Sequence, residues 1–378
     1  MYVLSLVGSN GVSPDANQLL TVSIGDGPVI TSASSDTFVV GSSGSFTITT
    51  TGYPSPAISY TGTLPSGVSF TDNLDGIANL NGIPASGTGG LYALFLKASN
   101  DVPPDATQDF TLTVQEAPLF TSANSANFTV ESAGTFSITT SGYPSAAITF
   151  ISDPALPASL TIIDNGDGTA TLSGTPGSGD GGSYAITLTA NNGVNPLATQ
   201  SLTLKIGQQP AITSLDNTTF VVGSSDSFTV TSSGFPYPAF SFSGSLPSDI
   251  SLTDNLDGTA TLGGTPADGT GGVFQFTITA DNDIPPQAEQ LFTLTVNEAP
   301  EITSNDHTNF SVNAAGEFTI TTNGYPLASI NYSSVPDLPT SITLVDNDDG
   351  TGTLSGTPQA GDGGVYLISL TADNGIDP

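Results

Sequence analysis

The chain has 378 residues, and its 34 acidic side chains face only 2 basic ones, giving a formal net charge of −32. Such a field repels nucleic-acid phosphates and anionic lipids, which excludes both as partners. The lack of cysteine excludes disulfides, thiol nucleophiles and zinc fingers, and the sequence holds no apolar run of the roughly 18 residues that a membrane helix needs.

Residues 1–27 match the closing segments of the repeats that follow. We therefore predict that they form the terminal strands of a preceding repeat. A Pro-x-x-Thr-Ser phrase then begins at residues 28, 118, 210 and 300, with spacings of 90, 92 and 90. Self-similarity of this kind is typical of tandem domains. The predicted repeats are 28–117, 118–209, 210–299 and 300–378, the last one without its final strand.

The repeats alternate between two types. Repeats 28–117 and 210–299 share Thr-Phe-Val-Val-Gly-Ser-Ser and Thr-Asp-Asn-Leu-Asp-Gly, and we name them type A. Repeats 118–209 and 300–378, here type B, carry Asn-Gly where type A has Asn-Asp. The period is therefore 182 residues, and the chain begins and ends at the same phase of a repeat. We expect it to be a window on a longer array.

Each repeat reads as about seven short strands separated by Gly, Pro and Asn-Asp turns, the pattern of an all-β sandwich. In the first full repeat, Ser45–Thr49 and Phe110–Val114 alternate apolar and polar side chains, and Tyr92–Leu96 is predicted to be a strand with them. The joints are short and contain proline, as at Gln115–Pro118, which predicts stiff connections. With strands that rise about 3.3 Å per residue, four such domains would form a rod on the order of 150 Å long.

A longer signature recurs in order through the chain. It runs Asp-Asn-Gly-Asp-Gly-Thr-Ala-Thr-Leu-Ser-Gly-Thr-Pro at 164–176, Gly-Gly-x-Tyr at 181–184 and Asn-Gly-Val-x-Pro-x-Ala-Thr-Gln at 192–200. This set resembles the putative-Ig repeats of bacterial surface proteins, which are similar to cadherin-like and other Ig-like sandwiches. The resemblance implies extracellular stalks and adhesins of bacteria, with no enzymatic activity in the repeat itself.

The acidic turns are the one candidate site for a ligand. Each turn places two carboxylates and an amide within five residues, and oxygen ligands of this kind suit Ca²⁺. The candidate ligands are Asp72, Asn73, Asp75, Asp164, Asn165, Asp167, Asp254, Asn255, Asp257, Asp346, Asn347 and Asp349, joined by Asp101 and Asp283 of a nearby loop. The alternative is a plain hairpin turn, in which Asn and Asp-Gly supply the backbone geometry.

Topology would bring these turns to the joints. In a seven-stranded sandwich, the turn and the loop after the sixth strand lie at the end that receives the preceding domain. Glu116 and Glu298 of the connections fall at the same place. A cation there would stiffen the joint and relieve repulsion in an acidic chain, although no cofactor is required by the sequence.

Catalysis has few candidates, since the one histidine, His307, has no counterpart in the other repeats. We therefore expect a non-catalytic structural stalk or fibre segment of a long extracellular protein, with neighbouring repeats or neighbouring copies as its partners. One alternative is an adhesive module for carbohydrate or a host protein. Another is a filament subunit, in which an incomplete last repeat accepts the strand 16–24 from a neighbour.

Overall fold

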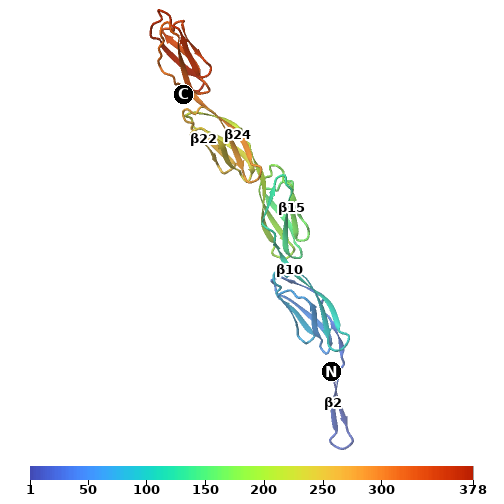
Figure 1. The fold of residues 1–378 in the computed structure, drawn as a ribbon. Helices are drawn as coiled ribbons and strands as arrows, with labels where there is room; N and C mark the ends of the chain where they lie inside the picture. Colours follow the sequence, from blue (N-terminus) through green and yellow to red (C-terminus); the bar gives the residue numbers. More distant parts are fainter. Residues whose placement is uncertain (378) are drawn as a thin grey trace. The chain divides into compact units, whose positions relative to one another are not determined.

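Residues 1–377, the part that the computed structural model describes, fold into strands and turns without a helix (Figure 1). No helix that could cross a membrane occurs in this part of the chain. The predicted all-β fold of tandem β-sandwiches is confirmed. The chain divides into two compact units, Met1–Gly177 with Ser183–Lys205, and Ser178–Gly182 with Ile206–Pro378.

The first unit begins with a hairpin and then builds two successive sandwiches. The hairpin consists of β1 (Tyr2–Gly8) and β2 (Ala16–Val22). The next strands are β3 (Asp26–Ile30), β4 (Ser35–Val39), β5 (Gly44–Tyr53), β6 (Ala57–Gly62), β7 (Val68–Asp72), β8 (Ile77–Gly82), β9 (Gly90–Ser99) and β10 (Ala106–Phe120). One sheet of the first sandwich has the order β3-β5-β8-β7, and the other contains β6, β9, β10 and β4.

The same order of strands recurs in the next sandwich. Its strands are β11 (Ser125–Thr129), β12 (Gly134–Tyr143), β13 (Ala147–Asp153), β14 (Leu160–Asp164), β15 (Thr169–Gly174), β16 (Gly182–Asn191) and β17 (Ala198–Ile212). The next set is β18 (Asn217–Val221), β19 (Asp226–Phe235), β20 (Ala239–Gly244), β21 (Ile250–Asp254), β22 (Thr259–Gly264), β23 (Gly272–Asp281) and β24 (Ala288–Ile302). The last set is β25 (Gly316–Tyr325), β26 (Ser329–Val335), β27 (Ile342–Asp346), β28 (Thr351–Gly356) and β29 (Leu367–Asp373).

Each complete sandwich begins with two short strands that belong to opposite sheets. In the first sandwich β3 pairs antiparallel with β5, whereas β4 pairs parallel with β10. The chain crosses between the sheets at the Thr-Ser phrase, where the Thr31 amide donates to the Thr49 carbonyl at 2.8 Å. A complete sandwich therefore has eight strand segments, one more than the count drawn from the alternation of residues.

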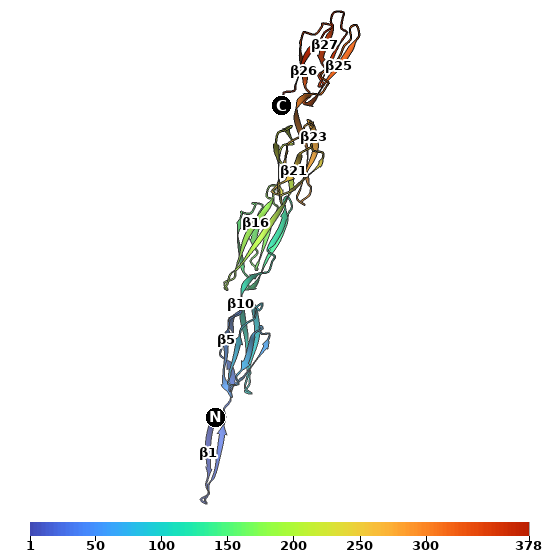
Figure 2. The same cartoon turned by 90° about the vertical axis from the view of Figure 1, so that its left-hand side faces the viewer.

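Successive sandwiches share a strand. The first part of β10 pairs with β9, and its last part, after a bulge between Glu116 and Leu119, pairs with β12 of the next sandwich. The strand can be followed through this joint in Figure 2. β17 and β24 repeat the arrangement, with bulges after Gln208 and Glu298. The connection that the sequence suggested as a short linker is thus part of a continuous strand.

Alternation along the strands builds each core. In the first sandwich the buried side chains are Phe38, Ile48, Ile58, Ala78, Leu80, Leu94, Leu96, Phe110, Leu112 and Val114. Every second residue of β10 from Phe110 to Val114 is at most 1% exposed, while the threonines between them face outward. Burying one such side chain contributes about 1.5–3 kcal/mol, so the last strand is a main source of stability for its sandwich.

The two ends of the chain differ from this pattern. All residues of β1 and β2 are exposed. At the other end, β26 and β29 pair only with each other within the described residues. The segment 307–311, which corresponds to β11, forms no strand there. In the other repeats β4 and β18 pair with β10 and β24, and no strand takes that place among the described residues of the last repeat.

Candidate functional site

Each acidic turn closes a tight hairpin between two short strands. In the first, Asp72 pairs with Ala78 across β7 and β8, and the Asn73 amide donates to the Ile77 carbonyl at 3.0 Å. The residue after the asparagine has a positive φ in every repeat, with values of 63°, 77°, 62° and 58° at Leu74, Gly166, Leu256 and Asp348. The turn geometry is therefore the same whatever side chain occupies its tip.

The first aspartate of each turn ties the hairpin to the neighbouring loop. Asp72 accepts the Ile58 amide on Oδ2 at 3.0 Å and the Leu74 amide on Oδ1 at 3.0 Å. The equivalent bonds to the start of the strand after the Pro turn are Ile148 N to Asp164, Phe240 N to Asp254 and Ile330 N to Asp346. These carboxylates hold backbone amides that would otherwise lack partners.

The second aspartate caps the return strand. Asp167 Oδ1 accepts both the amide and the hydroxyl of Thr169, at 3.0 and 2.6 Å. The hydroxyl bond is the largest of the effects that lower the pKa of Asp167, and the same bond from a threonine lowers the pKa of Asp257 and of Asp349. In the first repeat Ile77 replaces the threonine, so Asp75 accepts only the amide.

Replacing Thr169 with valine is expected to raise the pKa of Asp167 towards its ordinary value of 3.8, because the hydroxyl donor is lost while the shape is kept. A depressed carboxyl pKa stabilises the fold at pH values above the unfolded pKa, and this contribution disappears as the pH falls through the folded pKa. An NMR pH titration of the Asp167 carboxyl carbon measures the shift. An unchanged midpoint in the T169V variant would contradict the assignment, and Asp349 serves as the internal control.

An asparagine at the start of the loop after β9, and after its equivalents β16, β23 and β29, clamps each joint. Asn100 Nδ2 donates to the carbonyls of Asp26 and Pro54, both at 2.8 Å, while its Oδ1 accepts the Val102 amide at 3.2 Å. Asn192, Asn282 and Asn374 make the same three bonds in their own repeats. One amide thus joins the incoming strand, the Pro turn and its own loop.

The asparagine binds the backbone carbonyl of a residue in the incoming strand. In the joints at Glu116, Gln208 and Glu298, the side chain of that residue also binds the preceding repeat. Glu116 accepts the Gly87 and Gly89 amides at 2.7 and 3.0 Å, and Glu298 accepts those of Gly269 and Gly271. In the intervening joint, Gln208 Oε1 accepts the Gly179 and Gly181 amides at 3.1 and 3.2 Å. We call Glu116, Gln208 and Glu298 the pivot residues, since each one bonds both repeats that meet at its joint.

The structure brings the acidic turn, the asparagine loop and the incoming strand to the same end of a repeat, as topology predicted. It also gives the turn oxygens backbone amides as partners, which agrees with the alternative of a plain hairpin turn. Asp101 and Asp283 lie in the asparagine loop with φ of 62° and 63°. Among residues 1–377, no group of three or more His, Cys, Asp or Glu side chains is arranged to hold a metal ion.

Calcium at the joints stays a prediction. If Ca²⁺ binds there, adding it should raise the Tm of the chain and a chelator should lower it, because a ligand that binds only the folded state stabilises that state. Thermal unfolding with Ca²⁺, with Mg²⁺ and with chelator measures this effect. Identical unfolding curves in all three solutions would rule out joint calcium.

Two further charged pairs lie outside the turns and the joints. His307 is largely exposed, and its Nδ1 lies 2.9 Å from Asp306 Oδ1 of the adjacent residue. Lys97 forms an exposed ion pair with Asp105 at 2.7 Å, and this contact is the largest effect lowering the pKa of Asp105.

Comparison with known proteins gives a family match for one repeat. Residues 117–207 match the family model described as "Putative Ig domain". This repeat is therefore similar to Ig-like domains, whose fold is typically non-catalytic. No curated protein matches the chain.

Solved structures with similarity to these Ig-like repeats include two arrays of immunoglobulin domains. The I-band fragment I67-I69 from titin has 18% sequence identity and a TM-score of 0.41, over 72% of this chain and 96% of that one. Sidekick-1 immunoglobulin domains 1-5 have 15% identity and a TM-score of 0.34, over 95% of this chain and 80% of that one.

Proposed function

We propose that the chain is a structural spacer, a stalk or fibre segment of a long extracellular or cell-surface protein. The observation that supports this role is the two-way bonding of the pivot residue, which recurs at three successive joints. Its side chain is bound by the Gly-rich loop of the repeat behind it. Its carbonyl is bound by the asparagine of the repeat ahead.

A repeated joint of this kind suits a spacer better than a receptor. Each pivot side chain accepts two backbone amides, and a shared strand runs through the bonded residue. Bending at the joint would break these bonds together with the strand pairing on one side. The same joint recurs from repeat to repeat, as expected for a segment that sets length.

Small-angle X-ray scattering of the full chain tests the proposal. A spacer should give the profile of an extended particle, with a maximum dimension on the order of 150 Å if each repeat adds one strand length. The double variant Glu116→Ala with Asn192→Ala should broaden the distribution of distances, because the side-chain bonds of Glu116 and of Asn192 at one joint are all lost. A wild-type profile of freely jointed domains would contradict the spacer role.

A matched variant separates joint stiffness from repeat stability. Asp26 occupies the pivot position before the first sandwich, and its carbonyl accepts Asn100 as the other pivots do. Replacing Asp26 with alanine keeps this carbonyl and removes a side chain for which no hydrogen bond to the chain is seen. Scattering from the D26A variant should therefore equal that of the wild type.

A further inference from the structure

The side chain of the pivot residue alternates in charge along the chain. It is a glutamate at the end of the type A repeats, as Glu116 and Glu298, and a glutamine at the end of a type B repeat, as Gln208. The fit of the pivot against the Gly-rich loop does not alternate. A Cβ atom added to Gly89 would lie 2.8 Å from the Glu116 Cβ, and one added to Gly181 would lie 2.5 Å from the Gln208 Cβ. Loop and pivot are in close contact in both types of joint, so the joints differ in chemistry and not in shape.

The glutamate pivots bind the loop with both carboxylate oxygens. Glu116 Oε1 accepts the Gly87 amide at 2.7 Å, and its Oε2 accepts the Gly89 amide at 3.0 Å. Glu298 likewise uses one oxygen for each amide, at 2.5 and 2.9 Å. Gln208 accepts both amides of its loop on the single Oε1, at 3.1 and 3.2 Å. Hydrogen bonds to an ionised acceptor are shorter than neutral ones and roughly twice as strong. The side-chain part of the joint is therefore stronger after a type A repeat than after a type B repeat.

The loop changes in the opposite sense to the pivot. The residue between its two glycines is threonine in type A repeats, at positions 88 and 270, and aspartate in type B repeats, as Asp180 and Asp362. Asp362 Oδ2 accepts the Gln359 amide at 2.7 Å and the Ser341 hydroxyl at 2.8 Å. The bond from the Gln359 amide is the largest of the effects that lower the pKa of Asp362. A type B loop thus carries a carboxylate of its own, whereas a type A loop binds the carboxylate of the joint.

This exchange of the carboxylate gives a reason for the neutral pivot of type B. Asp180 stands between Gly179 and Gly181, whose amides both donate to Gln208. A glutamate at position 208 would place a second carboxylate beside Asp180, and like charges at such short range repel each other. The type B joint therefore keeps the two amide bonds without the added strength of an ionised acceptor.

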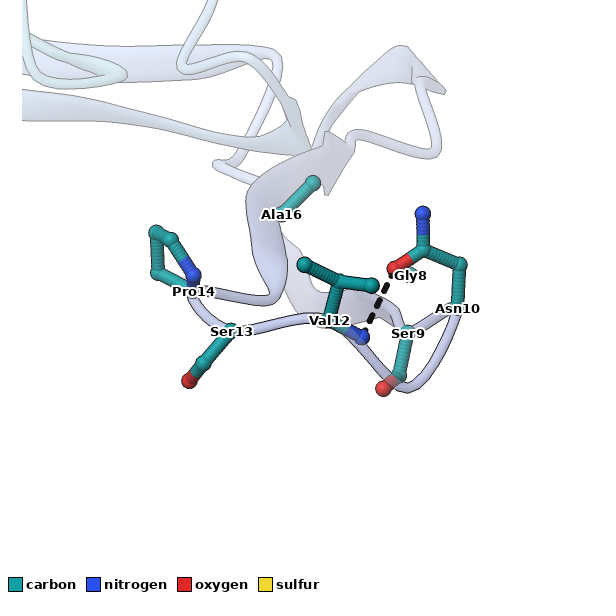
Figure 3. Close-up of a pocket in the computed structure, with 7 residues that line it drawn as sticks. All are labelled: Gly8, Ser9, Asn10, Val12, Ser13, Pro14 and Ala16. Carbon is teal, nitrogen blue, oxygen red and sulfur yellow. Dashed lines mark hydrogen bonds between the residues drawn. The ribbon is translucent and has the colours of Figure 1, made fainter.

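The asparagine half of the joint is constant. The Nδ2 groups of Asn192, Asn282 and Asn374 donate to the pivot carbonyl at 2.8 Å in all three joints. The local bond that each asparagine also makes can be seen at Asn10, where the Val12 amide donates to Oδ1 at 3.0 Å (Figure 3). Since the asparagine of the next repeat holds the pivot in the same way each time, the bonds of the pivot side chain to its own loop set how tightly two repeats are coupled.

We propose that the joints alternate in strength along the chain, so that the A–B pair, rather than the single repeat, is the cooperative unit of the array. A type A repeat is coupled to the repeat that follows it through the carboxylate of its pivot. A type B repeat is coupled to its follower through a neutral amide, and more weakly. The nearest-neighbour energies of the array then take two values in alternation. This pairing of repeats rests on the proposed spacer function, since it defines which joints hold the length of the segment.

Hydrogen exchange of glycine amides, measured by NMR on the full chain with isotope-labelled glycine, tests each joint separately. After correction for intrinsic rates, the loop glycines of the type A repeats, at 87, 89, 269 and 271, should exchange about tenfold more slowly than Gly179 and Gly181. Glu116→Gln should remove the difference in its own loop and leave the loop at 269–271 unchanged. Glu116→Asp keeps the negative charge but shortens the side chain, so its loop should lose protection as it does with glutamine.

A second measurement follows the coupling between repeats. Gly174→Ala destabilises repeat 118–209, because its Cβ would lie 2.0 Å from the Ser159 carbonyl oxygen. The defect should speed exchange in repeat 28–117, across the glutamate joint, more than in repeat 210–299, across the glutamine joint. Adding Glu116→Gln should abolish this excess while the effect on repeat 210–299 stays the same.

Three results would overturn the proposal. They are equal exchange of the loop glycines in both types of repeat, wild-type exchange in Glu116→Gln or Glu116→Asp, and an equal spread of the Gly174→Ala defect to both neighbours. Failure of the spacer role is a separate result. A scattering profile of freely jointed domains would contradict that role, whereas the local exchange rates do not depend on the overall dimensions of the chain.

Discussion

Replacing Asn282 with alanine is expected to lower the free energy of unfolding of its repeat by about 2–4 kcal/mol. The amide is 8% exposed, and its loss leaves the Gln208 and Pro236 carbonyls and the Ile284 amide without partners. A buried polar group without a partner costs about 1–3 kcal/mol, and partial access of water reduces the sum. Hydrogen exchange of peptides from residues 210–299 measures the loss repeat by repeat.

The chain contains its own control for this substitution. Asn10 has the same place in the motif, but its Nδ2 holds no carbonyl among the described residues, so Asn10→Ala should leave exchange in the sandwiches unchanged. Asn282→Asp should be at least as harmful as alanine, because a carboxylate would face two carbonyl oxygens. Wild-type protection in both Asn282 variants would show that the clamp does not stabilise the repeat.

Replacing Gly174 with alanine is expected to lower the free energy of unfolding of its repeat still more, by about 3–5 kcal/mol. Gly174 has a φ of 145°, and a Cβ atom there would lie 2.0 Å from the Ser159 carbonyl oxygen, which belongs to the backbone and has little room to move. The strained backbone and the forced displacement each contribute about 1–3 kcal/mol. Gly82, Gly264 and Gly356 are placed alike, with the corresponding distances between 1.9 and 2.1 Å.

The turn glycine Gly166 is the matched control. Its φ is 77°, but a Cβ atom added there would have no other atom within 4 Å, and Leu74 and Leu256 occupy the same place in type A repeats. Gly166→Leu should therefore lower the free energy of unfolding only through the strain of a positive φ, by about 1–2 kcal/mol. Chemical denaturation, monitored by hydrogen exchange in residues 118–209, compares the losses of unfolding free energy in the two variants. Equal losses would show that the close approach at Gly174 is relieved without cost.

The fold could be predicted from the sequence because alternation and turn chemistry recur with a fixed period. Ser45–Thr49, Tyr92–Leu96 and Phe110–Val114 lie inside β5, β9 and β10 as expected. The break between β3 and β4 could not be predicted from alternation. It depends on the pairing of each half with a different sheet, and that pairing joins residues far apart in the chain.

The joint was predicted only in part, for a physical reason. The carboxylates near each turn can be read from the sequence, and the cation expected beside them stays a prediction. That their oxygens accept backbone amides is something a sequence pattern does not show. A signal for the clamp was present in the repeats. The position of Asn100 is asparagine in every repeat, whereas the next residue changes between Asp101 and Gly193, so the amide itself is required. Likewise, Gln208 stands at the position that Glu116 has in the preceding joint. Both side chains offer an oxygen that accepts amides, and only Glu116 is charged.

The shared strands make each sandwich thermodynamically dependent on its neighbour. When one repeat melts, the first part of β10 loses its partners β9 and β4, and the part that pairs with β12 becomes the frayed edge of the next sandwich. Stability then follows a one-dimensional nearest-neighbour model, in which interior repeats are stabilised from both sides. Heat or force should therefore unzip the array inward from a terminal repeat, and lengthening the array should raise the melting temperature of every repeat within it.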